Sequence, residues 1–112
     1  MQSTVFYDNV HLASTTMQTG KTVHIGDSTD LMVQIIGTST NFTVAFEASL
    51  DGINFSTFEG RKVGDVTQTP ITSTSDKGLY EFDVTLIKAL RVNLTAIANG
   101  NISVLANGVH II

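Results

Sequence analysis

Hydrophobic and polar residues alternate most regularly within Asn41–Glu59. In the first half of this stretch every second side chain is apolar; these positions are Phe42, Val44, Phe46 and Ala48. A period of two predicts a β-strand that is buried on one face. Asp51 and Gly52 follow, a pair that tolerates the positive φ angles of a tight turn. Because Ile53 and Phe55 resume the alternation, the stretch predicts an antiparallel hairpin.

Shorter alternating or apolar runs predict further strands along the rest of the chain. These runs are Thr4–Tyr7, His11–Ala13, Thr22–Ile25, Leu31–Ile36, Leu79–Val84, Leu90–Ala98, a return through Ile102 and Val104, and Val109–Ile112. The turn signals Asn99-Gly100 and Asn107-Gly108 separate the last three runs. Residues 60–78 hold the chain's one proline and predict a long excursion, with a short edge strand around Ile71–Thr74.

The pattern sums to eight to ten short strands and includes no convincing helix, which is typical of an all-β protein. We therefore expect a single domain over residues 1–112, built as an antiparallel two-sheet β-sandwich of the jelly-roll or immunoglobulin-like kind. A barrel is the second choice. A chain of 112 residues is long enough to bury one core.

Two apolar segments predict contact with another chain. Leu31–Ile36 is apolar except for Gln34, so we expect cover on both faces, from a second sheet or from a neighbouring subunit. The run from Gly108 to Ile112 carries no charge that would discourage strand pairing, and it either meets a partner or closes the protein's own sheet. The expected interface residues are Leu31, Val33, Ile35, Val109, Ile111 and Ile112.

Composition narrows the classes of function. Charged residues make up 14% of the chain and hydrophobic residues 42%, a balance that argues against disorder. The net charge of −4 disfavours binding to nucleic acid, and no apolar run reaches the length of a membrane span. The chain has no cysteine, and its first residues show no signal-peptide pattern, so we expect synthesis in a reducing cytosol.

No pattern of residues predicts catalysis, a cofactor or a metal, and we expect a protein that is not an enzyme. His11, His24 and His110 lie far apart and lack the spacing of metal ligands. Asp27 and Asp30 flank an oxygen-rich turn that is compatible with calcium. Asp is favoured in turns in any case, because its carboxylate accepts hydrogen bonds from nearby backbone N–H groups.

The motif Ser49-Leu50-Asp51-Gly52-Ile53-Asn54-Phe55, with its flanking strands, resembles small virion proteins of tailed bacteriophages and prophages. The similar stretches are Met32–Phe58 and Tyr80–Ala106, which together cover most of the chain. The resemblance implies a non-enzymatic structural protein of the virion: capsid decoration, a head fibre, or a tail or baseplate module. It also implies synthesis in the host cytoplasm and partners among other virion proteins and copies of the chain itself, as a trimer or a higher ring.

A carbohydrate-binding module for attachment to a host surface is the alternative function. The chain has no tryptophan, so only Tyr7, Tyr80 or a surface phenylalanine is available to stack on a sugar ring. Contacts from the turns are expected at Asp51, Gly52 and Tyr80 in either case. Binding of the isolated domain to glycans, abolished by Tyr80→Ala or Tyr7→Ala, would favour this alternative.

Overall fold

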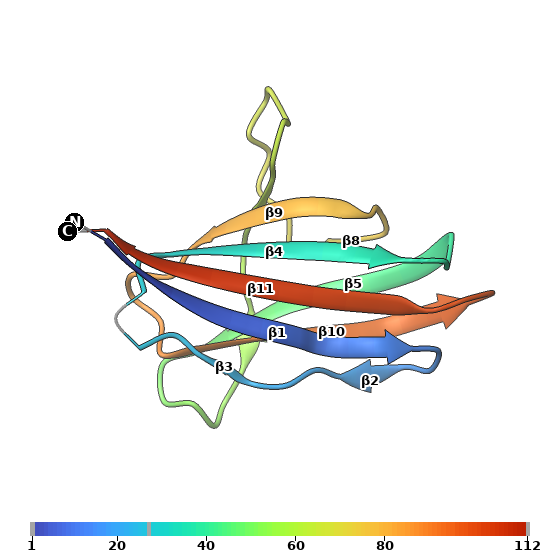
Figure 1. Cartoon of the computed structure of the whole chain (residues 1–112), viewed down its shortest axis with the longest axis horizontal. Helices are drawn as coiled ribbons and strands as arrows, with labels where there is room; N and C mark the ends of the chain where they lie inside the picture. Colours follow the sequence, from blue (N-terminus) through green and yellow to red (C-terminus); the bar gives the residue numbers. More distant parts are fainter. Residues whose placement is uncertain (1, 27, 112) are drawn as a thin grey trace.

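The computed structural model describes residues 2–26 and 28–111, with side chains for residues 14–26 and 28–108. Within these residues the chain forms eleven strands and no helix, arranged as two antiparallel sheets that pack face to face (Figure 1). No helix in the described part of the chain is long and apolar enough to cross a membrane. The architecture confirms the predicted all-β sandwich.

Sheet A is formed by five strands in the order β1-β11-β4-β9-β7. Their bounds are Gln2–Ser14 for β1, Ile102–Ile111 for β11, Asp30–Gly37 for β4, Gly78–Asp83 for β9 and Arg61–Lys62 for β7. Strand β11 thus pairs with β1 on one side and with β4 on the other.

Sheet B follows the order β2-β10-β5-β6, and β3 and β8 add short pairings to β10 and β5. Its strands are β2 (Gln18–Thr19), β3 (Val23–His24), β5 (Asn41–Ser49), β6 (Ser56–Thr57), β8 (Ser73–Thr74) and β10 (Ala89–Ala98). The long pair β5–β10 forms its centre, with one register shift between Leu94 and Ala96.

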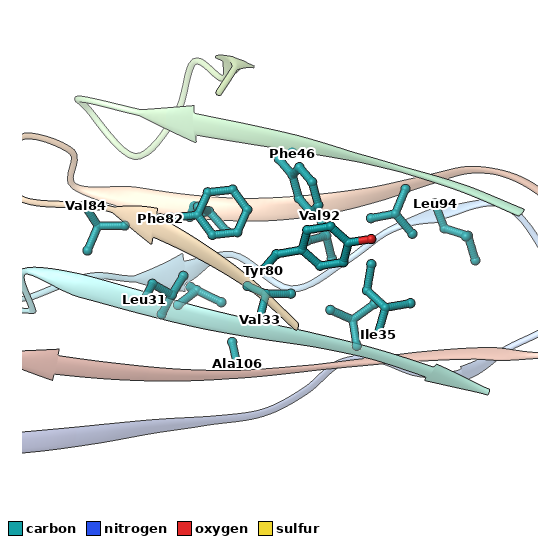
Figure 2. Close-up of a cluster of buried hydrophobic side chains, with 14 of the residues drawn as sticks. Leu31, Val33, Ile35, Phe46, Tyr80, Phe82, Val84, Val92, Leu94 and Ala106 are labelled. Carbon is teal, nitrogen blue, oxygen red and sulfur yellow. The ribbon is translucent and has the colours of Figure 1, made fainter. Parts of the chain in front are cut away.

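The core lies between the two sheets and is supplied by the alternating apolar positions. On β9, Tyr80 and Phe82 point inward and lie against Phe46 of β5 (Figure 2). The rings of Phe46 and Phe82 meet edge to face, with centroids 4.8 Å apart, an arrangement that aromatic pairs prefer. The predicted faces of the strands at residues 41–49 and 79–84 are therefore confirmed.

Two predictions about turns are corrected. Asn107-Gly108 is not a turn, because both residues lie within β11, where Gly108 pairs with Val5 and with Leu31. The hairpin after β5 exists, but its return strand is only Ser56–Thr57. Ile53 lies in the loop between the two strands and its side chain is 80% exposed, so it does not continue the buried face.

Candidate docking site at the Asp51 loop

The connection between β5 and β6, residues 50–55, is here called the Asp51 loop. One carboxylate oxygen of Asp51 accepts the backbone N–H groups of Ile53 and Asn54, each at 2.8 Å, and the hydroxyl of Ser49, also at 2.8 Å. The other oxygen accepts the Asn54 side-chain amide at 2.7 Å. Gly52 provides the positive φ of +81° that closes the turn.

These hydrogen bonds fix the charge state of Asp51. Donors from the Asn54 and Ile53 backbones, and then from Ser49, hold the pKa of this carboxyl far below its ordinary value of 3.8. A carboxylate of this kind stays ionised at neutral pH and accepts protons poorly, which makes it unsuited to acid–base catalysis. Asp51 and Gly52, predicted as contact residues, therefore serve first to build the loop.

The side of the Asp51 loop that faces sheet B is held by a charged pair. Nε of Arg91 on β10 donates to Oε1 of Glu47 on β5 at 2.7 Å. The same guanidinium lies 4.0 Å from the centre of the Phe55 ring, within the range of a cation–π contact. Because Phe55 belongs to the loop, the pair connects the loop to the two central strands of sheet B.

An open hollow of about 420 Å³ lies beside the loop. Its lining combines apolar side chains with small polar groups: Ala48, Ser49, Leu50, Asp51, Asn54, Ser56, Thr57, Phe58 and Ile87. The polar atoms of Ser49 and Asp51 already have partners within the loop. The hollow is therefore a contact surface in which the Ser49 hydroxyl and the Asp51 carboxylate are already hydrogen-bonded within the protein.

Three large apolar side chains are exposed on the two connections whose residues line the hollow, and we call them the apolar rim. Leu50 and Ile53 of the Asp51 loop are 75% and 80% exposed, and Leu86 of the β9–β10 connection is 86% exposed. The two connections are adjacent, because the backbone N–H of Lys88 donates to the Ser49 carbonyl at 2.9 Å. Isolated exposed apolar residues are common, but their grouping at one end of a sandwich indicates a binding surface.

Sequence reasoning missed the apolar rim. The alternation assigns Ile53 to the return strand of the hairpin, and it predicts nothing for Leu50 or Leu86. A leucine or isoleucine inside a turn is not on the buried face of a strand, and this position in the sequence could have indicated exposed apolar side chains.

The predicted interface on β4 is corrected. Leu31, Val33 and Ile35 are buried against sheet B in the protein's own core, so they are not available to another chain (Figure 2). The second sheet covers only one face of this strand. Gln34 and Ile36 on the other face are exposed, so the expected cover on both faces is wrong.

The C-terminal part of the predicted interface is described only in its backbone. Val109 pairs with Thr4 of β1 and Asp30 of β4, and Ile111 pairs with Gln2. The terminal run is therefore an inner strand of sheet A rather than a free edge. Ile112 lies outside the described residues.

Tyr80 is also corrected as a contact residue. Its side chain is fully buried, and its hydroxyl donates to the Asp76 carbonyl at 2.6 Å and forms a hydrogen bond of 2.7 Å with Thr74. A sugar ring has no access to it. The side chain of Tyr7, the other candidate platform, lies outside the described residues.

No metal centre emerges from the titratable side chains. Among the residues that the structure describes, no group of three or more His, Cys, Asp or Glu is placed to hold an ion. Asp27, in the turn considered for calcium, lies outside the described residues. Asp65 and Asp83, like Asp51, have pKa values lowered mainly by hydrogen bonds that their carboxylates accept, from Thr67 and from Thr85 respectively.

Comparison with known proteins gives a family and a fold. The family model described as XepA matches residues 3–108. The crystal structure of the SPBc2 prophage-derived protein YomS superposes with a TM-score of 0.88 at 21% identity, over 97% of this chain and 95% of that one. The PBSX exported protein XepA superposes with a TM-score of 0.89 at 22% identity, over 96% of this chain. The chain spans only 38% of the XepA structure, and no curated protein matches it in sequence.

Proposed function

The chain belongs to the XepA family, and we propose that it is a non-enzymatic structural component of a phage particle. Its place would be in capsid decoration, a head fibre, or a tail or baseplate module. One of the solved structures that share its fold is described as the SPBc2 prophage-derived protein YomS, which supports an origin in a phage or prophage. Beyond this origin, we propose that the protein is located in the virion and acts there through protein–protein assembly.

The observation that carries the proposal is that the Asp51 loop uses its polar groups internally and exposes its apolar side chains. The Asp51 carboxylate accepts hydrogen bonds from the loop's own backbone, whereas the side chains of Leu50, Ile53 and Leu86 are exposed to solvent. A loop already held by its own hydrogen bonds has less backbone freedom to lose on docking, and burial of the exposed apolar side chains would provide the driving force. This arrangement suits adhesion to a protein surface with a dry centre and a polar rim.

The direct test is mass spectrometry of particles purified by density gradient from the host that carries the gene. The protein is expected in the particle band at a fixed ratio to the major capsid or tail protein. A variant with Leu50→Ser, Ile53→Ser and Leu86→Ser is expected to keep the stability of the wild type, because these side chains are exposed, and to be lost from the particles.

Val66 provides the matched control. It is 94% exposed and lies on the excursion between β7 and β8, which projects from the opposite side of the body to the Asp51 loop (Figure 1). Val66→Ser is expected to enter particles normally. Absence of the wild-type protein from particles would refute the virion role, and normal incorporation of the triple variant would refute docking through the apolar rim.

A further inference from the structure

Three pairs in the sequence place Asp or Asn directly before a glycine: Asp51-Gly52, Asn99-Gly100 and Asn107-Gly108. In such a pair the glycine nitrogen can attack the side-chain carbonyl carbon of the residue before it, because glycine has no Cβ to hinder the approach. The reaction needs a glycine N–H that is free of hydrogen bonds and a side chain that water can reach. The fold therefore decides which of the three pairs reacts.

The pair Asp51-Gly52 is protected by the hydrogen bonds of its own loop. The N–H of Gly52 donates to Oγ of Ser49 at 2.8 Å, so its nitrogen is not free. The Asp51 carboxylate accepts hydrogen bonds from the backbone of Ile53 and Asn54. These bonds hold it in the ionised form, and an ionised carboxylate resists attack by a nucleophile.

The pair Asn107-Gly108 is protected by sheet A. Both residues lie within β11, and Gly108 is buried and pairs with Val5 on one side and with Leu31 on the other. Backbone N–H groups of an inner strand are bonded to the neighbouring strands. The sheet must therefore open before the nitrogen of Gly108 can react.

The pair Asn99-Gly100 has neither protection. It lies on the connection from β10 of sheet B to β11 of sheet A, and both residues are exposed. Among the residues that the structure describes, neither the Asn99 side chain nor the Gly100 N–H has a hydrogen-bond partner. The side chain thus meets water, and the attacking nitrogen is free.

We propose that Asn99 is a site of spontaneous deamidation in the folded protein. The Gly100 nitrogen gives its proton to solvent and forms a bond to Cγ of Asn99, while the bond from Cγ to Nδ2 breaks and the amide nitrogen takes up a proton and leaves as ammonia. A water molecule then adds to one of the two carbonyl carbons of the five-membered ring. Ring opening leaves aspartate or isoaspartate at position 99, and either product adds one negative charge to a chain of formal net charge −4.

The two products differ in their effect on the connection. Its ends are anchored to the β4–β5 connection, because Ser39 donates from Oγ to the Ala98 carbonyl at 2.7 Å and from its N–H to the Asn101 carbonyl at 3.1 Å. Space between these anchors is small, since a Cβ added to Gly100 would lie 2.7 Å from the Ser39 nitrogen. Isoaspartate lengthens the backbone by one carbon between the anchors, whereas aspartate changes only an exposed side chain.

The test compares two asparagines in one sample of the full chain. Folded protein is incubated at mildly alkaline pH and digested, and the peptides that contain Asn99 and Asn107 are followed by mass spectrometry. Asn99 is expected to lose its amide at least about a hundredfold faster, because Asn107 reacts only from the small population in which β11 has opened. In urea both asparagines precede glycine in an unfolded chain, so their rates are expected to be similar.

Asn99→Gln is the matched control. It keeps the amide but is one methylene longer, so it cannot form the five-membered ring, and it is expected to stay unmodified at an unchanged Tm. Equal rates at Asn99 and Asn107 in the folded protein would overturn the proposal. So would an Asn99 amide that survives as long in the folded protein as that of Asn107.

A second measurement concerns the two products, which ion exchange and peptide mapping distinguish. Asn99→Asp supplies the aspartate form alone and is expected to melt with the wild type. The isoaspartate form is expected to melt about 4–8 °C lower, the shift caused by the loss of about one hydrogen bond in a domain of this size. Equal Tm values would refute the strain on the connection. The role in the particle is independent of these outcomes, because particle composition measures it.

Discussion

Replacement of Tyr80 by phenylalanine separates a structural role of this tyrosine from a ligand-binding role. Tyr80 lies in the core (Figure 2), and its hydroxyl reaches the β8–β9 connection. There it donates to the Asp76 carbonyl at 2.6 Å and bonds with Thr74 at 2.7 Å. Tyr80→Phe keeps the ring and removes both hydrogen bonds.

The expected loss of stability follows from these two bonds. A hydrogen bond within a protein contributes about 0.5–1.5 kcal/mol net. Because Asp76 and Thr74 lie near the surface and regain water, we expect Tyr80→Phe to lower the free energy of unfolding by about 1–2 kcal/mol. Tyr80→Ala also empties a buried ring site, and its expected loss is about 3–5 kcal/mol. For a domain of this size each kcal/mol lowers Tm by about 4–8 °C.

Urea unfolding with an unchanged m-value is the appropriate assay, because it shows that only stability has changed. Thr74→Val and the double variant complete a mutant cycle, which isolates the coupling between the two hydroxyls. Our reasoning would be refuted if Tyr80→Phe stayed within about 0.5 kcal/mol of the wild type, the range of ordinary surface substitutions.

Three further predictions concern other contacts. Folding lowers the pKa of Asp51, so the ionised carboxylate stabilises the protein fully above the ordinary Asp pKa range, and this stabilisation is lost as the pH falls below about 4. The urea midpoint of the wild type should therefore decline over that pH range more steeply than the midpoint of Asp51→Asn. An added methyl group at Gly60 would collide with the ring of Phe82, so Gly60→Ala should lower the free energy of unfolding by about 1–3 kcal/mol, seen by calorimetry as a lower Tm. Arg91→Met keeps the aliphatic stem but breaks the ion pair with Glu47, and it should lose about 1 kcal/mol and reduce the dependence of Tm on salt.

The strands and their faces were predictable where one face of a strand packs on the core. In β9 the alternation assigns Tyr80 and Phe82 inward and Glu81 outward, as found. Local patterns failed where pairing partners decide the outcome. Asn107-Gly108 has the composition of a tight turn, but Gly108 is bonded on both sides within sheet A, and this pairing outweighs the local preference.

The candidate site was predictable only in part. Asp51-Gly52 marks a turn, but its length depends on hydrogen bonds from Ile53 and Asn54 that a periodicity does not reveal. Once those bonds close a longer loop, Ile53 is carried out of the strand and becomes part of the apolar rim. The connection that contains Leu86 lies next to this loop because the Lys88 N–H donates to the Ser49 carbonyl, a contact between residues far apart in the chain.

The position of β11 in the sequence determines the order in which the two sheets can form during synthesis. Sheet B is formed from strands that precede β11, so the nascent chain can pair all of them before β11 leaves the ribosome. Sheet A cannot close at that stage, because β1 and β4 are joined only through β11. We therefore expect an intermediate in which β1 is unpaired and β4 lacks one neighbour, and in which unpaired edges favour aggregation. Emergence of β11 from the ribosome is then the step that ends this exposure.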